Sequence, residues 1–436
     1  MVGLTLAAVL LWCAAPLRRH FKMASTLLVV PATLVSALVY YLEPGYRVYA
    51  TAFLVAEAVA VAAFDPTTRL TWRGARSQHD DPDAVSRPGV WPYALAATLI
   101  VWVGFRNLTA GPNAASSLLT MIAVLGIIAS LYWADCAGLL NPAVFVWFAS
   151  MFLSVALAIG GAKGEEWKSC SAQFEKCTIV HRLYTGIFTS ENVLGEVAFL
   201  CLLLVFQTPK YKRRPLHVAT FVVLLLIAGS RTPLVAIAVY VVIGALLALA
   251  AKRDGNRYRP PPVILAGVIA AITGGGLWLG YTSTGSRFSN RGQLWSQMAA
   301  IVRPTSLVGS SQAEYKALLD RGLFFGHYPT SEYMALMFFG GLIAVALFAA
   351  MLYSACVGAS ASTRGELALR IAPMICVALY GVLELGWSAS TVDPTMWTLI
   401  AVLAAAAAAR SRTVEPVEAA PVPVGRAAAR ARNHRV

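Results

Sequence analysis

The stretch GSRTPLVAIAVYVVIGALLALAAKR, residues 229–253, decides the fold class. A short polar turn is followed by an apolar run over 233–251. This run can cross the hydrocarbon core of a bilayer, which takes about 20 residues in a helix. The run ends at once in Lys252 and Arg253. A turn, an apolar span and a basic loop are together typical of one pass of a multi-pass membrane protein.

The composition extends this pattern to the whole chain. Of its 436 residues, 58% are hydrophobic and only 13% are charged, whereas soluble domains have about 25% charged residues. Such a chain has too few polar side chains to cover a wetted surface, which excludes a soluble protein. A formal net charge of +14 would suggest nucleic acid as the partner of a soluble protein. Here we assign the charge to membrane topology, with the lipid bilayer as partner and no nucleic acid.

We expect an all-α, polytopic integral membrane bundle of about 12–13 transmembrane helices with one large external loop. Every second loop is rich in Lys and Arg, which places these loops and the C-terminus on the cytoplasmic side. The bundle occupies residues 1–412, and the Ala-, Pro- and Arg-rich residues 413–436 are predicted to form a disordered basic cytoplasmic tail. The predicted spans are 2–15, 24–42, 47–64, 91–105, 114–133, 138–160, 190–207, 216–229, 233–251, 262–281, 332–355, 367–387 and 395–409.

Two long loops, 161–189 and 282–331, lie on the predicted external side. The first holds Cys170 and Cys177 in one polar segment, in a compartment that permits disulfides. The pair can form a loop disulfide or remain as two free thiols. The other five cysteines lie in or beside apolar runs, where a small core residue is expected, and no metal site is predicted.

The turn before the span at 233–251 contains the first candidate binding group. Thr232 can cap a helix and Pro233 suits a first helical position. The N-terminus of that helix would point outward, with about half a positive charge and free N–H groups that suit a phosphate. Arg231 adds a full charge at the same point. The alternative is an interfacial arginine that reaches lipid headgroups.

The run STGSRFSNRGQLW, residues 283–295, opens the long external loop. Arg287 and Arg291 lie four residues apart and can share one helical face. Guanidinium groups match diphosphate oxygens in geometry. The topology rule disfavours external arginines, so an anionic ligand explains them. Loop salt bridges with Glu314 and Asp320 are the alternative.

The run GHYPTSEY, residues 326–333, lies at the mouth of an incoming helix. His327 and Glu332 are both candidates for the general base that activates a hydroxyl. The alternative for the histidine is a cap or a hydrogen-bonded loop residue.

Together these elements resemble the O-antigen ligase and O-antigen polymerase superfamily over about residues 190–360. That superfamily has a Ser-Arg-Thr turn, a Gly-Arg…Trp stretch that opens a large periplasmic loop, and a His-Asn-x-Tyr-Leu type segment followed by Gly-Leu in the next helix. The counterparts here, in the same order, are Ser230-Arg231-Thr232, Asn290-Arg291 with Trp295, and His327 with Gly340-Gly341-Leu342.

The resemblance implies a GT-C-like glycosyltransferase of the bacterial cytoplasmic (inner) membrane, with its active site facing the periplasm or exterior. Such an enzyme moves a glycan en bloc from an undecaprenyl-type polyprenyl diphosphate to a hydroxyl on a glycan, glycolipid or protein. It inverts the anomeric carbon and uses no metal or other cofactor. His327 and Glu332 would be catalytic, and Arg231, Arg287 and Arg291 would bind the diphosphate. The supporting residues would be Ser230, Thr232, Trp295 and Tyr328.

Two other functions stay open at this point. A polysaccharide polymerase of the same superfamily fits equally well, because the acceptor site has no motif of its own. A transporter or flippase of lipid-linked sugars would place charged groups at membrane depth. Its candidates are Glu57, Glu196 and Glu384.

Overall fold

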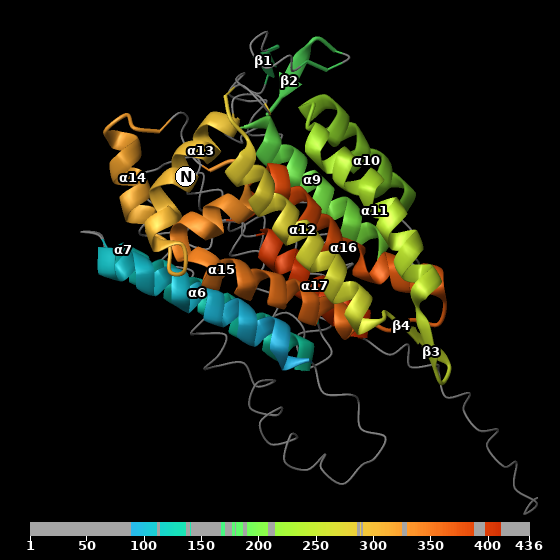
Figure 1. Ribbon diagram of the computed structural model, residues 1–436. Helices are drawn as coiled ribbons and strands as arrows, with labels where there is room; N and C mark the ends of the chain where they lie inside the picture. Colours follow the sequence, from blue (N-terminus) through green and yellow to red (C-terminus); the bar gives the residue numbers. More distant parts are fainter. Residues whose placement is uncertain are drawn as a thin grey trace, which may run out of the picture.

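The chain is mostly helical in the parts that the computed structural model describes (Figure 1). The described residues are 89–110, 114–136, 140, 167–170, 177–178, 180–185, 190–207, 214–285, 288, 291–324, 329–387 and 397–410. Nine of the predicted spans appear there as helices. They are α6 (Val90–Ala110), α7 (Ala114–Cys136), α9 (Glu191–Phe206), α10 (Arg214–Ala228), α11 (Arg231–Ala250), α12 (Pro262–Thr282), α15 (Glu332–Val357), α16 (Arg364–Leu383) and α17 (Trp397–Arg410).

The other predicted spans, 2–15, 24–42, 47–64 and, apart from Leu140, 138–160, lie outside the described residues, as does the predicted tail at 413–436. Among the described helices, α11, α12, α15 and α16 are long and apolar enough to cross a membrane. Side chains of α11 and α12 are largely exposed, whereas those of α15 and α16 are largely buried in the core. The bundle therefore has an apolar outer layer, suited to lipid, around α15 and α16.

The predicted helical class is confirmed, with two short hairpins added and with helices inside the segment 282–331. Two short antiparallel hairpins occur, β1 (Trp167–Ser169) with β2 (Arg182–Tyr184) and β3 (Lys252–Asp254) with β4 (Arg257–Arg259). The described part of 282–331 forms α13 (Arg291–Val302), the 3-10 turn η4 (Arg303–Thr305) and α14 (Gln312–Asp320). Leu294, Trp295 and Met298 of α13 are buried. These three side chains give the segment an apolar face that packs on the bundle.

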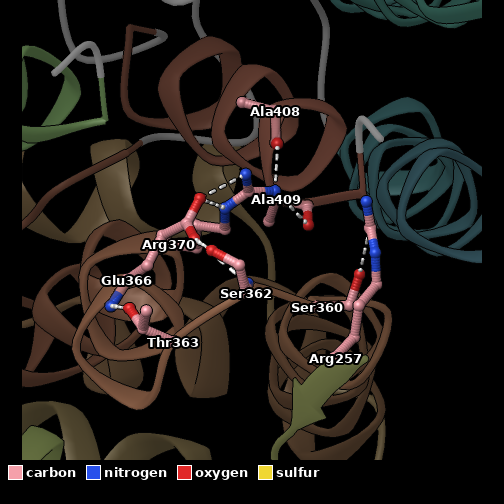
Figure 2. Close-up of polar contacts among 8 residues, drawn as sticks. All are labelled: Arg257, Ser360, Ser362, Thr363, Glu366, Arg370, Ala408 and Ala409. Carbon is pink, nitrogen blue, oxygen red and sulfur yellow. Dashed lines mark hydrogen bonds and ion pairs between the residues drawn. The ribbon is translucent and has the colours of Figure 1, made fainter. Parts of the chain in front are cut away.

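The helices run alternately up and down, so the bundle has two distinct ends (Figure 1). We call the end with β1–β2, α13 and the start of α11 the site end. The opposite end carries the β3–β4 hairpin, the start of α16 and Arg410, and we call it the basic end. At the basic end, Arg370 pairs with Glu366 over 2.7 Å and donates to the carbonyl oxygens of Ala408 and Ala409 (Figure 2). These bonds hold α17 against α16.

Helix α15 is broken at Gly341, where the backbone has φ +68° and ψ −164°. The segment that follows α13 fills this break with its own backbone. Leu342 N donates to Ser306 O over 2.9 Å, and Ser310 N donates to Phe338 O over 2.7 Å. Backbone groups that the break removes from the helix are therefore paired, as a low-dielectric interior requires.

Helix α6 fixes the same junction from the other side. The indole nitrogen of Trp102 donates to Gly340 O over 2.7 Å, and Arg106 donates to the carbonyl oxygens of Gly309 and Ser310, each over 2.9 Å. The broken helix, the inserted loop and α6 thus form one hydrogen-bonded unit. This unit positions the first half of α15, which begins at Glu332.

Candidate functional site

The turn at Gly229–Ser230 begins α11 at the site end. Gly229 has φ +65°, a left-handed conformation that favours glycine. The N-cap is Ser230, and α11 begins at Arg231, two residues before the predicted start at Pro233. The predicted capping role of Thr232 is therefore wrong. The Arg231 side chain is exposed beside the first turn of the helix.

Glu384, just after the end of α16, connects four elements of the site end. Its Oε1 accepts from the Arg291 guanidinium over 2.7 Å and from Thr232 Oγ1 over 3.0 Å. Its backbone oxygen accepts from Glu332 N over 3.0 Å. Arg291 also donates to the carbonyl oxygen of Leu383. The structure thus links the predicted ligand Arg291 to the residue next to Arg231 through one carboxylate.

The Arg291–Glu384 pair is shielded from water, with side-chain exposures of 19% and 9%. Loss of either partner of such a shielded pair is strongly destabilising, because the other charge stays buried without its partner. The pair fixes the start of α13 against the end of α16. It also uses part of the hydrogen-bonding capacity of Arg291, and the partner is Glu384 rather than Glu314 or Asp320, the salt-bridge partners expected from the sequence.

Glu332, the first residue of α15, is a buried carboxylate only 1% exposed. Its Oε2 accepts from Trp387 N over 2.8 Å, whereas its Oε1 has no hydrogen-bond partner among the described residues. A Cβ at Gly381 of α16 would lie 2.9 Å from the Glu332 Cβ. A glycine at 381 therefore allows the close approach of α16 that buries this carboxylate.

A third buried carboxylate, Glu196 of α9, lies on the other side of the segment 384–387. Thr398 Oγ1 of α17 donates to Glu196 Oε1 over 2.6 Å and also bonds Gly386 O. The strand-like segment after α16 therefore touches three carboxylates: its own Glu384, Glu332 through Trp387 N, and Glu196 through Thr398. The sequence indicated Glu196 and Glu384 only as charged groups at membrane depth that a transporter could use.

The remaining predicted residues have different positions. Trp295 is fully buried, donates to Thr330 Oγ1 over 3.1 Å and packs against Phe288 with ring centroids 5.7 Å apart. It therefore ties α13 to the segment just before Glu332. Ser230 Oγ is buried and has no hydrogen-bond partner in the described part of the chain. The predicted site residues Arg287, His327 and Tyr328 lie outside the described residues.

Cys170 and Cys177 form a disulfide in the β1–β2 region. Leu183 of β2 is buried, and its Cδ2 would lie 2.9 Å from a Cβ at Gly229. The disulfide-bonded segment therefore packs directly on the turn that leads to Arg231. In the described ranges, no group of three or more His, Cys, Asp or Glu side chains could hold a metal ion.

We predict that Cys170→Ala combined with Cys177→Ala destabilises the protein by about 2 kcal/mol, because the unfolded chain gains freedom. The check is the thermal midpoint of the purified protein in detergent. Dithiothreitol should lower the midpoint of the wild type in the same direction and leave the double variant unchanged. An equal response of both proteins to the reductant would contradict the disulfide.

Four described helices are long and apolar enough to cross a membrane, and a buried polar cluster lies at one end of the bundle. These features define the protein as a helical membrane protein. No family model, curated protein or solved structure matches the chain.

Proposed function

We propose that the chain is a membrane glycosyltransferase of the kind that the O-antigen ligase resemblance implies. It moves a glycan from a polyprenyl diphosphate to an acceptor hydroxyl at the outer face of the cytoplasmic membrane. One observation carries the proposal. Glu384 contacts both Arg291 and Thr232, the neighbour of Arg231, and its backbone contacts Glu332. One predicted diphosphate ligand, the residue next to a second one, and the backbone of a predicted base thus belong to one connected cluster.

Arg231 and the N-terminus of α11 are the primary anion site in this proposal. The first backbone N–H groups of a helix have no partner within it, and the helix dipole is positive there. The exposed guanidinium of Arg231 can reach solvent and a ligand. Arg291 is paired with Glu384 and, through it, holds Thr232 and the start of α11 in place.

Glu332 supplies the base in this proposal. Its carboxylate is buried in this structure and must become accessible to the acceptor, whose hydroxyl proton it then accepts as the acceptor oxygen bonds the anomeric carbon from the face opposite the leaving group. The bond between that carbon and the diphosphate oxygen breaks, and the diphosphate leaves with the electron pair. Fixed guanidinium groups stabilise the charge that develops on it. A polymerase of the same superfamily would use the same steps with a lipid-linked acceptor.

A transporter of lipid-linked sugars is the second candidate, and one specific feature favours it. Helix α15 is broken at Gly341, and the carboxylates of Glu196 and Glu332 are buried in the bundle. Broken helices and buried charges are typical of transporter binding sites.

A transfer assay separates the two candidates. We expect the purified wild-type protein in detergent to consume a polyprenyl-diphosphate-linked glycan, and Arg231→Ala to lower turnover about 100-fold, as loss of one fixed charge-stabilising group does in other enzymes. Arg182→Ala removes an exposed cation from β2 at the same end and should leave turnover unchanged. No turnover by the wild type, or full turnover by Arg231→Ala, would contradict the proposal.

A further inference from the structure

The β3–β4 hairpin connects two helices whose outer sides are apolar and exposed. Leu249 at the end of α11 is 71% exposed, and Val263 at the start of α12 is 84% exposed. Both helices are long and apolar enough to span a membrane. Exposed apolar side chains immediately before and after the hairpin place it where hydrocarbon gives way to lipid headgroups.

The hairpin is fixed to the bundle. Tyr258 and Ala361 exchange two backbone hydrogen bonds, of 2.8 and 3.1 Å, between β4 and the turn that joins α15 to α16. Arg257 donates to Ser360 Oγ over 3.1 Å (Figure 2). The Arg364 guanidinium lies over the Tyr258 ring, 5.4 Å from its centroid. These contacts fix the position of the hairpin backbone, which carries the charged side chains.

The exposed side chains of the hairpin are mostly cationic. Lys252, Arg253 and Arg259 are exposed, and Arg364 is exposed beside them. Asp254 is the one carboxylate of the hairpin, and it contacts Arg259 over 3.3 Å with both side chains more than half exposed. Such an exposed pair contributes little. The surface therefore keeps a net positive charge.

A nearby carboxylate does not neutralise this surface. Glu366 in the first turn of α16 accepts from Ser362 over 2.6 Å and pairs with Arg370 over 2.7 Å (Figure 2). The charge of Glu366 is therefore neutralised by Arg370 within α16. The cations of the hairpin remain available to an external anion.

We propose that the β3–β4 hairpin, with Arg364, is a binding surface for the phosphate headgroup of an anionic phospholipid. The cations face the headgroup, and the exposed apolar side chains of α11 and α12 beside Leu249 and Val263 contact the acyl chains. A free phosphate would use only the cations. The apolar border therefore favours a lipid, and this surface is separate from the site end and independent of the proposed transferase activity.

A thermal-stability titration in detergent tests the surface. The probes are dihexanoyl phosphatidylglycerol, dihexanoyl phosphatidylcholine and inorganic phosphate, and the measured quantity is the midpoint of unfolding. We expect phosphatidylglycerol alone to raise the midpoint of the wild type in a saturable way. The triple variant Lys252→Gln, Arg253→Gln and Arg259→Gln should bind it roughly 100-fold more weakly, at about fivefold for each cation removed near a lipid surface.

The matched control removes the same charge at the site end. Arg182→Gln, Lys316→Gln and Arg321→Gln neutralise three exposed cations there, and this variant should bind phosphatidylglycerol like the wild type. Equal loss in both triple variants would mean non-specific charge attraction and would overturn the proposal. So would an equal effect of inorganic phosphate, or unchanged binding by the hairpin variant with its lipid-free midpoint intact.

Discussion

Gly341→Ala is expected to abolish correct folding of the bundle. A Cβ at residue 341 would overlap the carbonyl oxygen of Leu307 and lie 2.5 Å from the amide nitrogen of Gly309. Both contacts are with backbone, so no side chain can rotate away. The backbone at Gly341 also has φ +68°, which is strained for alanine. Clash and strain together should cost more than about 4 kcal/mol, a magnitude reached only through such specific mechanisms.

The measurement is the yield of monodisperse protein in detergent and its thermal midpoint. Gly274→Ala in α12 is the matched control, because a Cβ there meets nothing within 4 Å. Alanine also has a higher helix propensity than glycine by about 1 kcal/mol, so this variant should fold at least as well as the wild type. A Gly341→Ala protein with wild-type yield and midpoint would show that the segment 305–310 does not fill the break in α15.

Glu384→Ala is expected to destabilise the site end by about 3–5 kcal/mol, because it leaves the shielded Arg291 charge without its carboxylate. The same change removes the acceptor of the Thr232 hydroxyl and frees the start of α11. Glycan transfer should therefore fall together with stability. Thermal midpoints and turnover of the same preparations measure both effects.

A double variant tests whether the loss arises from the pair itself. Arg291→Met combined with Glu384→Leu removes both charges and should be more stable than Glu384→Ala alone, since no unpaired charge remains. Its transfer activity should stay low, because Arg291 is also a proposed ligand. Additive destabilisation by the two changes would mean that the residues do not interact. Thr232→Val, which removes one hydrogen bond, should cost only about 1 kcal/mol.

Hydrophobic runs predicted the helices well because a membrane span depends on a local property, the length of an apolar segment. The runs at 262–281 and 332–355 correspond closely to α12 and α15. The end of the run at 367–387 was wrong, since α16 ends at Leu383 and 384–387 is not helical. Leu385 and Trp387 kept the run apolar. Glu384 lies just after the last residue of the helix, and its carboxylate bonds Arg291. No local sequence pattern indicates that partner.

The break in α15 and the inserted loop could not be predicted for a similar reason. Glycine is common in membrane helices, so Gly340 and Gly341 do not by themselves indicate a break. The conformation of Gly341 is explained only by the close approach of Gly309, which lies 32 residues earlier in the chain. The prediction that Arg231 and Arg291 are ligands rests on their charge on the predicted external side. The connection of Arg291 to Thr232 through Glu384 depends on the tertiary packing of α11, α13 and α16.

Equilibrium binding of undecaprenyl diphosphate to the purified protein in detergent measures the proposed diphosphate site directly. We expect saturable binding that inorganic pyrophosphate competes away. Arg231→Ala should bind at least tenfold more weakly, as expected for about 1.4 kcal/mol from one charge-assisted contact, and Arg182→Ala should bind like the wild type. Equal affinity of the wild type and Arg231→Ala would contradict the claim that the start of α11 binds a diphosphate.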